Sequence, residues 1–264
     1  MLSRTVACTK LSPAEAHMPS EARSSSSARP AEEALEERSG DNLYPAQLDV
    51  QFGDHAMHLD VPAGVWNPTP HGAHLGEMLA GCDFSGEHVL ELGTGCGLHA
   101  IVIAQQGARA LTLTEIDQAI LDNARHNLGK HEIAVPIHTQ VADWTHVNGG
   151  PFDALVTNPP FCKSGKRYRR HFIDTLILDA HKLVRPGGRL LFVQSSMADI
   201  SRSLNLMRDC GMTVSVLGET SGPFRAYYDE DPAFLAEAAR IPNGYSVRDG
   251  TRYERLIAFE AQLP

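Results

Sequence analysis

The fold of this 264-residue chain is decided by one stretch, Val89-Leu90-Glu91-Leu92-Gly93-Thr94-Gly95-Cys96-Gly97. A short apolar run over residues 89–92 leads straight into alternating glycines, and residues 98–105 then have a helical composition. Glycine lets the backbone turn tightly and come close to a ligand. A strand, a glycine turn and a helix in this order predict a ligand at the carboxyl end of the strand, in the crevice of an open α/β sheet.

On both sides of this stretch, segments of strand and helix character alternate. Further strands are expected over residues 110–114, 135–138, 153–157, 189–194, 212–217 and 255–259, and helices over 74–80, 118–128, 171–183 and 200–210. This alternation predicts a mostly parallel sheet with helices on both faces. Residues 48–52 and 57–61 alternate apolar and polar side chains around a Gly-Asp turn, so a short β-hairpin is expected ahead of the sheet.

The first 41 residues differ from the rest of the chain. They contain a run of four serines, Ser24 to Ser27, and little periodic apolar content. Such a stretch buries too little surface to offset the entropy lost on ordering. We therefore expect a disordered tail over residues 1–41 and one domain over 42–264, with a substrate-side segment over 42–80 and a catalytic core over 81–264.

Composition and charge narrow the class of protein. Hydrophobic residues make up 42% and charged residues 21%, and the formal net charge is −9. This acidic net charge argues against a protein that binds long stretches of nucleic-acid backbone. A local basic patch remains compatible with the net charge. The five cysteines form neither a C-x-x-C pair nor a zinc pattern, so free thiols, a reducing compartment and no metal site are expected. Without an apolar run of roughly 20 residues, we expect no membrane segment and a cytoplasmic location.

The glycine spacing discriminates between two kinds of ligand. A dinucleotide fingerprint, G-x-G-x-x-G, needs its third glycine at position 98, which is Leu98, so a nicotinamide dehydrogenase is disfavoured. Glu91, Gly93, Gly95 and Gly97 instead follow the spacing E-x-G-x-G-x-G, which resembles the first motif of the class I methyltransferases. The resemblance implies a Rossmann-like domain with a mostly parallel, seven-stranded sheet, and S-adenosyl-L-methionine as the cofactor.

Two further acids follow strands at the expected places. Glu115 ends the strand that lies about 20 residues beyond the glycine loop, where an acid accepts hydrogen bonds from ribose hydroxyls. Asp143 follows the third strand of the core. The resemblance implies that Glu91 faces the methionine part of the cofactor, Glu115 the ribose and Asp143 the adenine amine. For Asp143, a plain loop or capping role remains an alternative.

After the fourth strand comes a second motif, Asn158-Pro159-Pro160-Phe161. Its prolines fix φ and prevent a helix, so Asn158 is held in a rigid, extended loop. The motif resembles the catalytic motif of methyltransferases that act on planar nitrogens, namely adenine, cytosine and guanine amines and glutamine amides. Asn158 and Pro159 offer oxygens that accept hydrogen bonds from the N–H groups of such a poor nucleophile, and Phe161 stacks on the flat group. We expect these three residues to be catalytic.

A basic segment follows this motif. It consists of Tyr168 and the cations Lys163, Lys166, Arg167, Arg169 and Arg170. In an acidic protein this favours an anionic substrate, and Lys166, Arg167, Arg169 and Arg170 are the candidates for binding it. A solvated surface at a helix start explains the same residues equally well. Further on, Arg225, Tyr227 and Tyr228 either cover the site or belong to an ordinary surface loop.

The resemblance extends from about residue 48 and is nearest to the branch with protein-glutamine and ribosomal-RNA guanine enzymes. The tail does not resemble the helical recognition domain of the bacterial release-factor enzymes, and the chain lacks the duplicate domain of the large guanine enzymes. We expect an S-adenosylmethionine-dependent N-methyltransferase whose acceptor is a protein glutamine amide or a small-molecule amide or amine. The alternatives are a ribosomal-RNA base as acceptor, and a methyltransferase-fold subunit that only binds a partner.

Overall fold

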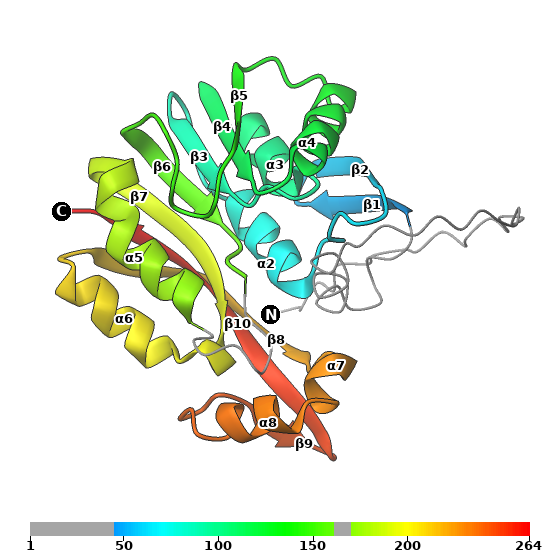
Figure 1. The fold of residues 1–264 in the computed structure, drawn as a ribbon, viewed down its shortest axis with the longest axis vertical. Coiled ribbons are helices and arrows are strands. Elements are labelled where there is room, and N and C mark those ends of the chain that lie inside the picture. The colour runs from blue at the N-terminus through cyan, green and yellow to red at the C-terminus, as the bar shows by residue number, and fades with distance from the viewer. Residues whose placement is uncertain (1–44, 161–169) are drawn as a thin grey trace, which may run out of the picture.

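The computed structural model describes residues 45–160 and 170–264. The predicted tail, Phe161 and the cations Lys163, Lys166, Arg167 and Arg169 lie outside these residues. The centre is a mixed sheet in which seven strands follow the order β5-β4-β3-β6-β7-β10-β8 and the short β9 pairs with β10 (Figure 1). The strands are β3 (His88–Leu92), β4 (Ala110–Glu115), β5 (Ile137–Val141), β6 (Phe152–Thr157), β7 (Val184–Ser195), β8 (Thr213–Pro223), β9 (Ser246–Arg248) and β10 (Thr251–Gln262).

The direction of the strands determines which loops meet. β3 pairs in parallel with β4 and β6, β4 with β5, and β6 with β7. The carboxyl ends of these strands therefore lie at one edge of the sheet. β10 runs antiparallel to β7, with Leu256 opposite Ser195. The amino-terminal part of β10 consequently reaches the same edge as the carboxyl end of β7.

Helices cover both faces of the sheet, as the alternation predicts (Figure 1). One core forms where α2 (Pro70–Leu79), α3 (Leu98–Gln105) and α4 (Gln118–Lys130) pack on Val89 of β3 and Leu191 of β7. The other forms where α5 (His171–Leu183) and α6 (Ile200–Asp209) pack on Leu90 and Phe192. Neighbouring residues of one strand thus belong to opposite cores, as the two-residue period of a strand requires. The Rossmann-like α/β expectation is confirmed.

The local signals at helix starts explain two boundaries. Asp117 caps α4 by accepting a hydrogen bond from the backbone N–H of Ala119 at 2.8 Å, as the sequence predicts. The start predicted for α2 was wrong, because the helix begins at Pro70 and not at residue 74. Thr69 accepts a hydrogen bond from the N–H of Gly72 at 3.2 Å, and proline is well suited to a first helical turn.

The predicted hairpin is confirmed and forms a separate two-stranded sheet of β1 (Ala46–Phe52) and β2 (His55–Val61). Its apolar side chains belong to the first core, and Asp60 adds a polar link, with its carboxylate 2.8 Å from Nζ of Lys130 on α4. Hydrogen bonds from Lys130 and His126 hold the pKa of Asp60 well below its usual range. Nδ2 of Asn127 donates to the carbonyl of Asp60 and to that of Cys96, at 2.9 Å each. The hairpin is thereby linked to the glycine loop through α4.

An insertion between β8 and β10 carries α7 (Ala226–Asp229), α8 (Pro232–Ala238) and β9, and it extends from one end of the long strands (Figure 1). It has a small core of its own, in which Tyr228 stacks on Phe234 with ring centroids 4.7 Å apart. Arg225, Tyr227 and Tyr228 belong to this insertion. Among the residues that the structure describes, none of the helices combines the length and the apolar character needed to cross a bilayer.

Candidate functional site

A cavity of about 430 Å³ lies at the edge of the sheet where the parallel strands end. Its walls come from the glycine loop, from the ends of β4 and β6, from the segment ahead of α2 and from the insertion. Of the predicted site residues, Gly93, Gly95, Glu115, Asp143, Asn158 and Pro159 line it. The other residues discussed below that line it are Trp66, His71, Gly72, Thr94, Cys96, His99, Ile116, Trp144, Pro160, Phe172, Arg225, Tyr227 and Tyr228.

The glycines of the loop have two different roles. All three have positive φ, and Gly93 and Gly95 line the cavity. Gly97 caps α3 from the position before it, and a Cβ on Gly97 would lie 2.9 Å from Cδ1 of Leu128 on α4. The first two glycines therefore bring the backbone to the cavity, whereas the third lets α3 pack closely against α4. Burial raises the pKa of the Cys96 thiol between them to about 12, so this thiol is no nucleophile at neutral pH.

Glu115 holds the glycine loop in place. Its Oε1 accepts a hydrogen bond from the backbone N–H of Gly95 at 2.9 Å, and its Oε2 accepts one from that of Ile116 at 3.2 Å. Burial nevertheless raises the pKa of Glu115 above its ordinary value. A carboxylate that is kept partly buried at a cavity wall is suited to binding hydroxyl groups of a ligand.

Glu91 is almost fully buried and contacts the cavity only through its neighbours. The hydroxyl of Thr94 donates to its Oε2 at 2.6 Å, and Nδ1 of His99 lies 3.2 Å from its Oε1. Nε2 of His99 lies 2.8 Å from the carbonyl oxygen of Gly72 and donates to it. The sequence analysis did not identify His99, since its partners lie in segments that no local spacing relates.

A second wall is apolar and aromatic. Ile116 is 69% exposed although it lines the cavity, and Asp143 is exposed beside it. The rings of Trp144 and Phe172 meet edge to face with centroids 5.1 Å apart. Nε1 of Trp144 donates to the carbonyl of Phe172 at 3.1 Å, which fixes the indole. This combination of an exposed aliphatic side chain, aromatic rings and an exposed carboxylate matches the chemistry of a flat heterocycle with an amino group.

Asn158 lies at the end of β6, which is tied to β3 by a 2.8 Å hydrogen bond from the Thr157 hydroxyl to the carbonyl of Leu92. Its side chain is half-buried and makes no hydrogen bond with any residue in the described ranges 45–160 and 170–264. A Cβ at Gly72 would lie 3.5 Å from Nδ2 of Asn158. The amide thus lies next to the start of α2 at the cavity wall and is available to a ligand.

Arg170 does not line the cavity. It is 9% exposed and its guanidinium bonds to Asp174 and to the hydroxyl of Ser203, both at 2.8 Å. Arg170 therefore does not make the substrate contact predicted for it, because its guanidinium is buried between α5 and α6 and binds protein side chains there. Arg225, Tyr227 and Tyr228, in contrast, line the cavity. Of the two readings of that segment, covering the site is the one that fits.

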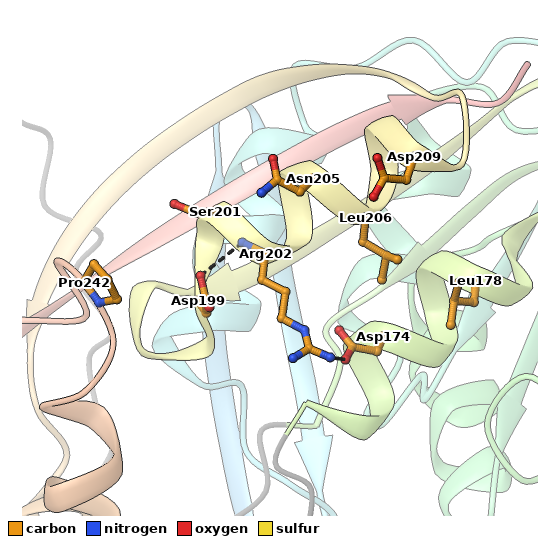
Figure 2. Close-up of a pocket in the computed structure, with 9 residues that line it drawn as sticks. All are labelled: Asp174, Leu178, Asp199, Ser201, Arg202, Asn205, Leu206, Asp209 and Pro242. Carbon is orange, nitrogen blue, oxygen red and sulfur yellow. Dashed lines mark hydrogen bonds and ion pairs between the residues drawn. The ribbon is translucent and has the colours of Figure 1, made fainter.

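A separate groove of about 490 Å³ lies beside α5 and α6 (Figure 2). Figure 2 shows Arg202 reaching Asp174, at an ion-pair distance of 2.7 Å. Asp199 caps α6 by accepting a hydrogen bond from the backbone N–H of Arg202 at 3.0 Å. Because these groups satisfy one another and no predicted site residue lines the groove, the chemistry is assigned to the cavity at the strand ends.

Residues 75–222 match the family model of the methyltransferase small domain. The chain belongs to this family. A tRNA1(Val) (adenine(37)-N6)-methyltransferase of Parabacteroides distasonis is 30% identical over 139 residues, which cover 46% of this chain and 59% of that protein. A release factor glutamine methyltransferase of Chlorobaculum tepidum is 31% identical over 130 residues, which cover 39% of this chain and 44% of that protein. The chain thus matches less than two thirds of the length of either relative.

Solved structures agree with this family in their fold. A 16S rRNA methyltransferase of T. thermophilus, in complex with AdoMet and guanosine, has a TM-score of 0.54 at 20% identity and covers 81% of this chain and 50% of that one. A tRNA m1G37 methyltransferase of M. jannaschii has a TM-score of 0.54 at 14% identity, with coverages of 82% and 56%. This methyltransferase small domain protein is an enzyme that uses S-adenosyl-L-methionine. The class I methyltransferase expectation is confirmed.

Proposed function

We propose that the chain methylates a planar nitrogen that is held by Asn158 and Pro159. The observation that carries this proposal is the amide of Asn158, which lines the same cavity as Gly95 and Glu115 and has no hydrogen-bond partner within the described part of the chain. A buried or half-buried polar group without a partner in the protein is suited to a partner in the ligand.

The residues at the cavity fit the cofactor. Glu115 would accept hydrogen bonds from the ribose hydroxyls, Asp143 would accept one from the adenine amine, and Ile116 would provide an apolar contact for the adenine. Gly93 and Gly95 let the backbone approach the methionine part of the cofactor. Glu91 fixes the side chains of Thr94 and His99, which line the same part of the cavity. When bound, S-adenosylmethionine supplies a methyl group that its positively charged sulfur has already activated.

The acceptor nitrogen is the difficult partner in this reaction. The lone pair of an amide or exocyclic amine is delocalised, and no side-chain base is strong enough to remove the proton first. The side-chain oxygen of Asn158 and the carbonyl oxygen of Pro159 accept hydrogen bonds from the N–H groups of the acceptor. These hydrogen bonds direct the nitrogen lone pair toward the methyl group and stabilise the positive charge that develops on the nitrogen. The two prolines and the Thr157 hydrogen bond keep these oxygens in place before the substrate arrives, which reduces the cost of alignment. Phe161, which lies outside the described residues, is the third residue proposed for this step.

The first class of acceptor we propose is a glutamine amide of a protein, or a small-molecule amide or amine. A net charge of −9 disfavours an extended nucleic-acid contact. Arg225 is the one lysine or arginine among the cavity-lining residues that the structure describes. The release factor glutamine methyltransferase among the relatives is consistent with such an acceptor.

An RNA base is the second candidate, and a different observation favours it. The acceptor side of the cavity carries Trp66, Tyr227 and Tyr228, and aromatic rings stack well on unpaired bases. The adenine methyltransferase among the relatives acts on tRNA by its name. Lys166, Arg167 and Arg169 would then contact phosphates, since the segment that carries them joins Pro160 to Arg170, and Pro160 and the nearby Phe172 line the cavity.

One experiment separates these candidates. The protein is incubated with S-adenosylmethionine labelled in its methyl group and with a cell extract, which is then divided into protein, RNA and small-molecule fractions. Label in protein or small molecules supports the first class, and label in RNA supports the second. Mass spectrometry of the labelled product is expected to place the methyl group on nitrogen. A methyl group on oxygen or carbon contradicts the role proposed for Asn158.

A further inference from the structure

A histidine and a glutamate from distant parts of the chain meet at the acceptor side of the cavity. His71, in the first turn of α2, lines the cavity and is 8% exposed. Its Nε2 lies 3.5 Å from Oε2 of Glu254 on β10. This is an ion-pair distance without the alignment of a hydrogen bond, and Nε2 is otherwise a buried atom with no partner. The carboxylate thus lies beside the imidazole without forming a hydrogen bond to it, so the ring can still exchange a proton with a ligand.

Glu254 is itself in an unusual position. It is 3% exposed and lies on the part of β10 that reaches the carboxyl edge of the sheet. Its Oε2 accepts a 2.5 Å hydrogen bond from the hydroxyl of Ser195. Within residues 45–160 and 170–264, no lysine or arginine pairs with it. Burying a carboxylate without a cation is costly, so a positive charge that forms beside Glu254 during the reaction is stabilised by it.

His71 lies close to the proposed methyl acceptor. Its neighbour Gly72 approaches Asn158 so closely that a Cβ on Gly72 would lie 3.5 Å from Nδ2 of Asn158. His71 and Asn158 line the same cavity. A nitrogen that is hydrogen-bonded to Asn158 would therefore lie in the cavity that His71 also lines.

We propose that His71, oriented by Glu254, takes the proton that the acceptor nitrogen releases on methylation; this inference rests on the proposed function. The nitrogen lone pair forms the new bond to the methyl carbon while the carbon–sulfur bond breaks and its electron pair stays on sulfur, which becomes neutral. The methylated nitrogen then carries a positive charge and one proton too many. That proton moves to Nδ1 of His71, the ring nitrogen that does not face Glu254. Glu254 then stabilises the imidazolium that results.

The other titratable groups at this place do not compete for the role. His99 also lines the cavity, but its ring nitrogens lie within hydrogen-bond distance of Glu91 and Gly72. His74 on α2 is bound to the carbonyl of Gly218, and burial lowers its pKa. Burial and the charge of Glu254 raise the pKa of the Tyr228 phenol, so it stays neutral. The remaining charged or titratable groups from the insertion that face this side are Arg225 and Tyr227.

The test measures the rate of label transfer from S-adenosylmethionine to the cell extract as a function of pH, from about 5.5 to 9. The wild-type rate is expected to fall at the acidic end, because a protonated His71 cannot accept a proton. His71→Gln should lower the rate on the order of 100-fold and remove this acidic limb. Glu254→Gln should lower it about tenfold, because the positive charge that forms on the ring during the reaction loses its carboxylate partner. His74→Gln is the matched control on the same helix, with an unchanged limb.

Binding of S-adenosylhomocysteine and the melting temperature are measured for each variant, and both should stay near the wild-type values in His71→Gln. A wild-type rate that is flat across this pH range overturns the proposal, whether or not the variants fold. An active His71→Gln with the wild-type profile overturns it as well and leaves the proposed function intact. If the wild-type protein labels nothing in the extract, the proposed function itself has failed, and this inference fails with it.

Discussion

The backbone N–H of Gly95 donates a hydrogen bond to Oε1 of Glu115 at 2.9 Å, so the loop after β3 and the acid that ends β4 form one unit. Burial raises the pKa of this carboxyl group even though two backbone N–H groups bind it. A carboxyl group whose pKa is raised by folding stabilises the fold below its unfolded pKa and loses this contribution as the pH rises through the folded value. At neutral pH, the charge of Glu115 therefore costs stability.

Glu115→Gln is expected to raise the melting temperature of the cofactor-free protein at pH 7. The difference should shrink as the pH falls toward 4.5, the ordinary pKa of this carboxyl group, because folding makes the wild-type residue easier to protonate. Affinity for S-adenosylhomocysteine should fall about tenfold at pH 7, since a neutral amide is a weaker acceptor for hydroxyl groups. Thermal unfolding and calorimetry check the two effects. A variant that is less stable than wild type at pH 7 would show that the charge is not the dominant cost.

The two roles of the glycines can be separated by a pair of substitutions. Gly97→Ala places a Cβ 2.9 Å from Leu128 at a φ of +83°, so we expect a loss of about 1–3 kcal/mol of stability. Gly95→Ala, at a φ of +55°, meets no protein atom within 4 Å. It should cost about 1 kcal/mol through strain alone and lower the cofactor affinity more than Gly97→Ala does. Equal effects of both substitutions on binding would mean that the third glycine also touches the cofactor.

Asn158→Ala tests the chemistry directly. Losing one directed hydrogen bond in a preorganised site typically costs on the order of 3 kcal/mol, so the rate should fall roughly a hundredfold or more. Affinity for S-adenosylhomocysteine should hardly change, because Asn158 is proposed to act on the acceptor. Asn158→Asp keeps an acceptor oxygen and should retain more activity than alanine. Single-turnover rates and calorimetry make the comparison, and normal turnover by the alanine variant would exclude the planar-nitrogen mechanism at this residue.

The basic segment is tested by changing Lys166, Arg167 and Arg169 together to glutamine. We expect a higher KM, an unchanged cofactor affinity and, with RNA as acceptor, a weaker dependence of binding on salt. Arg170→Gln provides the contrast, because it breaks a buried pair with Asp174 and should cost about 3 kcal/mol of stability. If the triple variant has the wild-type KM, the three cations belong to a solvated surface.

Local signals predicted the helices well. α3 and α5 begin and end where the sequence analysis expected them, since their apolar patterns are bounded by a glycine loop and by Pro186. The long strands were predicted too short. β10 extends over Thr251–Gln262 because β7 and β8 pair with its two sides and β9 pairs with its amino-terminal end. Such pairing depends on distant segments that no local window contains.

The site shows the same division. Glu115 and Asn158 could be predicted because each follows a strand whose end position is fixed by the sheet. His71 and Glu254 could not, since 183 positions of chain separate them and only the antiparallel β10 brings them together. The sequence could not distinguish Arg170 from the cations before it, because a run of positive charges does not show which side chain is buried in an ion pair.

The hydrogen bonds of Asn127 affect how the affinities of the proposed cofactor and acceptor should be measured. Its Nδ2 donates to the carbonyl of Cys96, in the glycine loop proposed to hold the cofactor, and to that of Asp60. The chain that follows Asp60 lines the proposed acceptor side of the cavity with Trp66 and His71. Occupation of one side is then expected to change the affinity of the other, and linkage requires the same factor in both directions. A Michaelis constant obtained at a single cofactor concentration would describe the pair of ligands and not the acceptor alone.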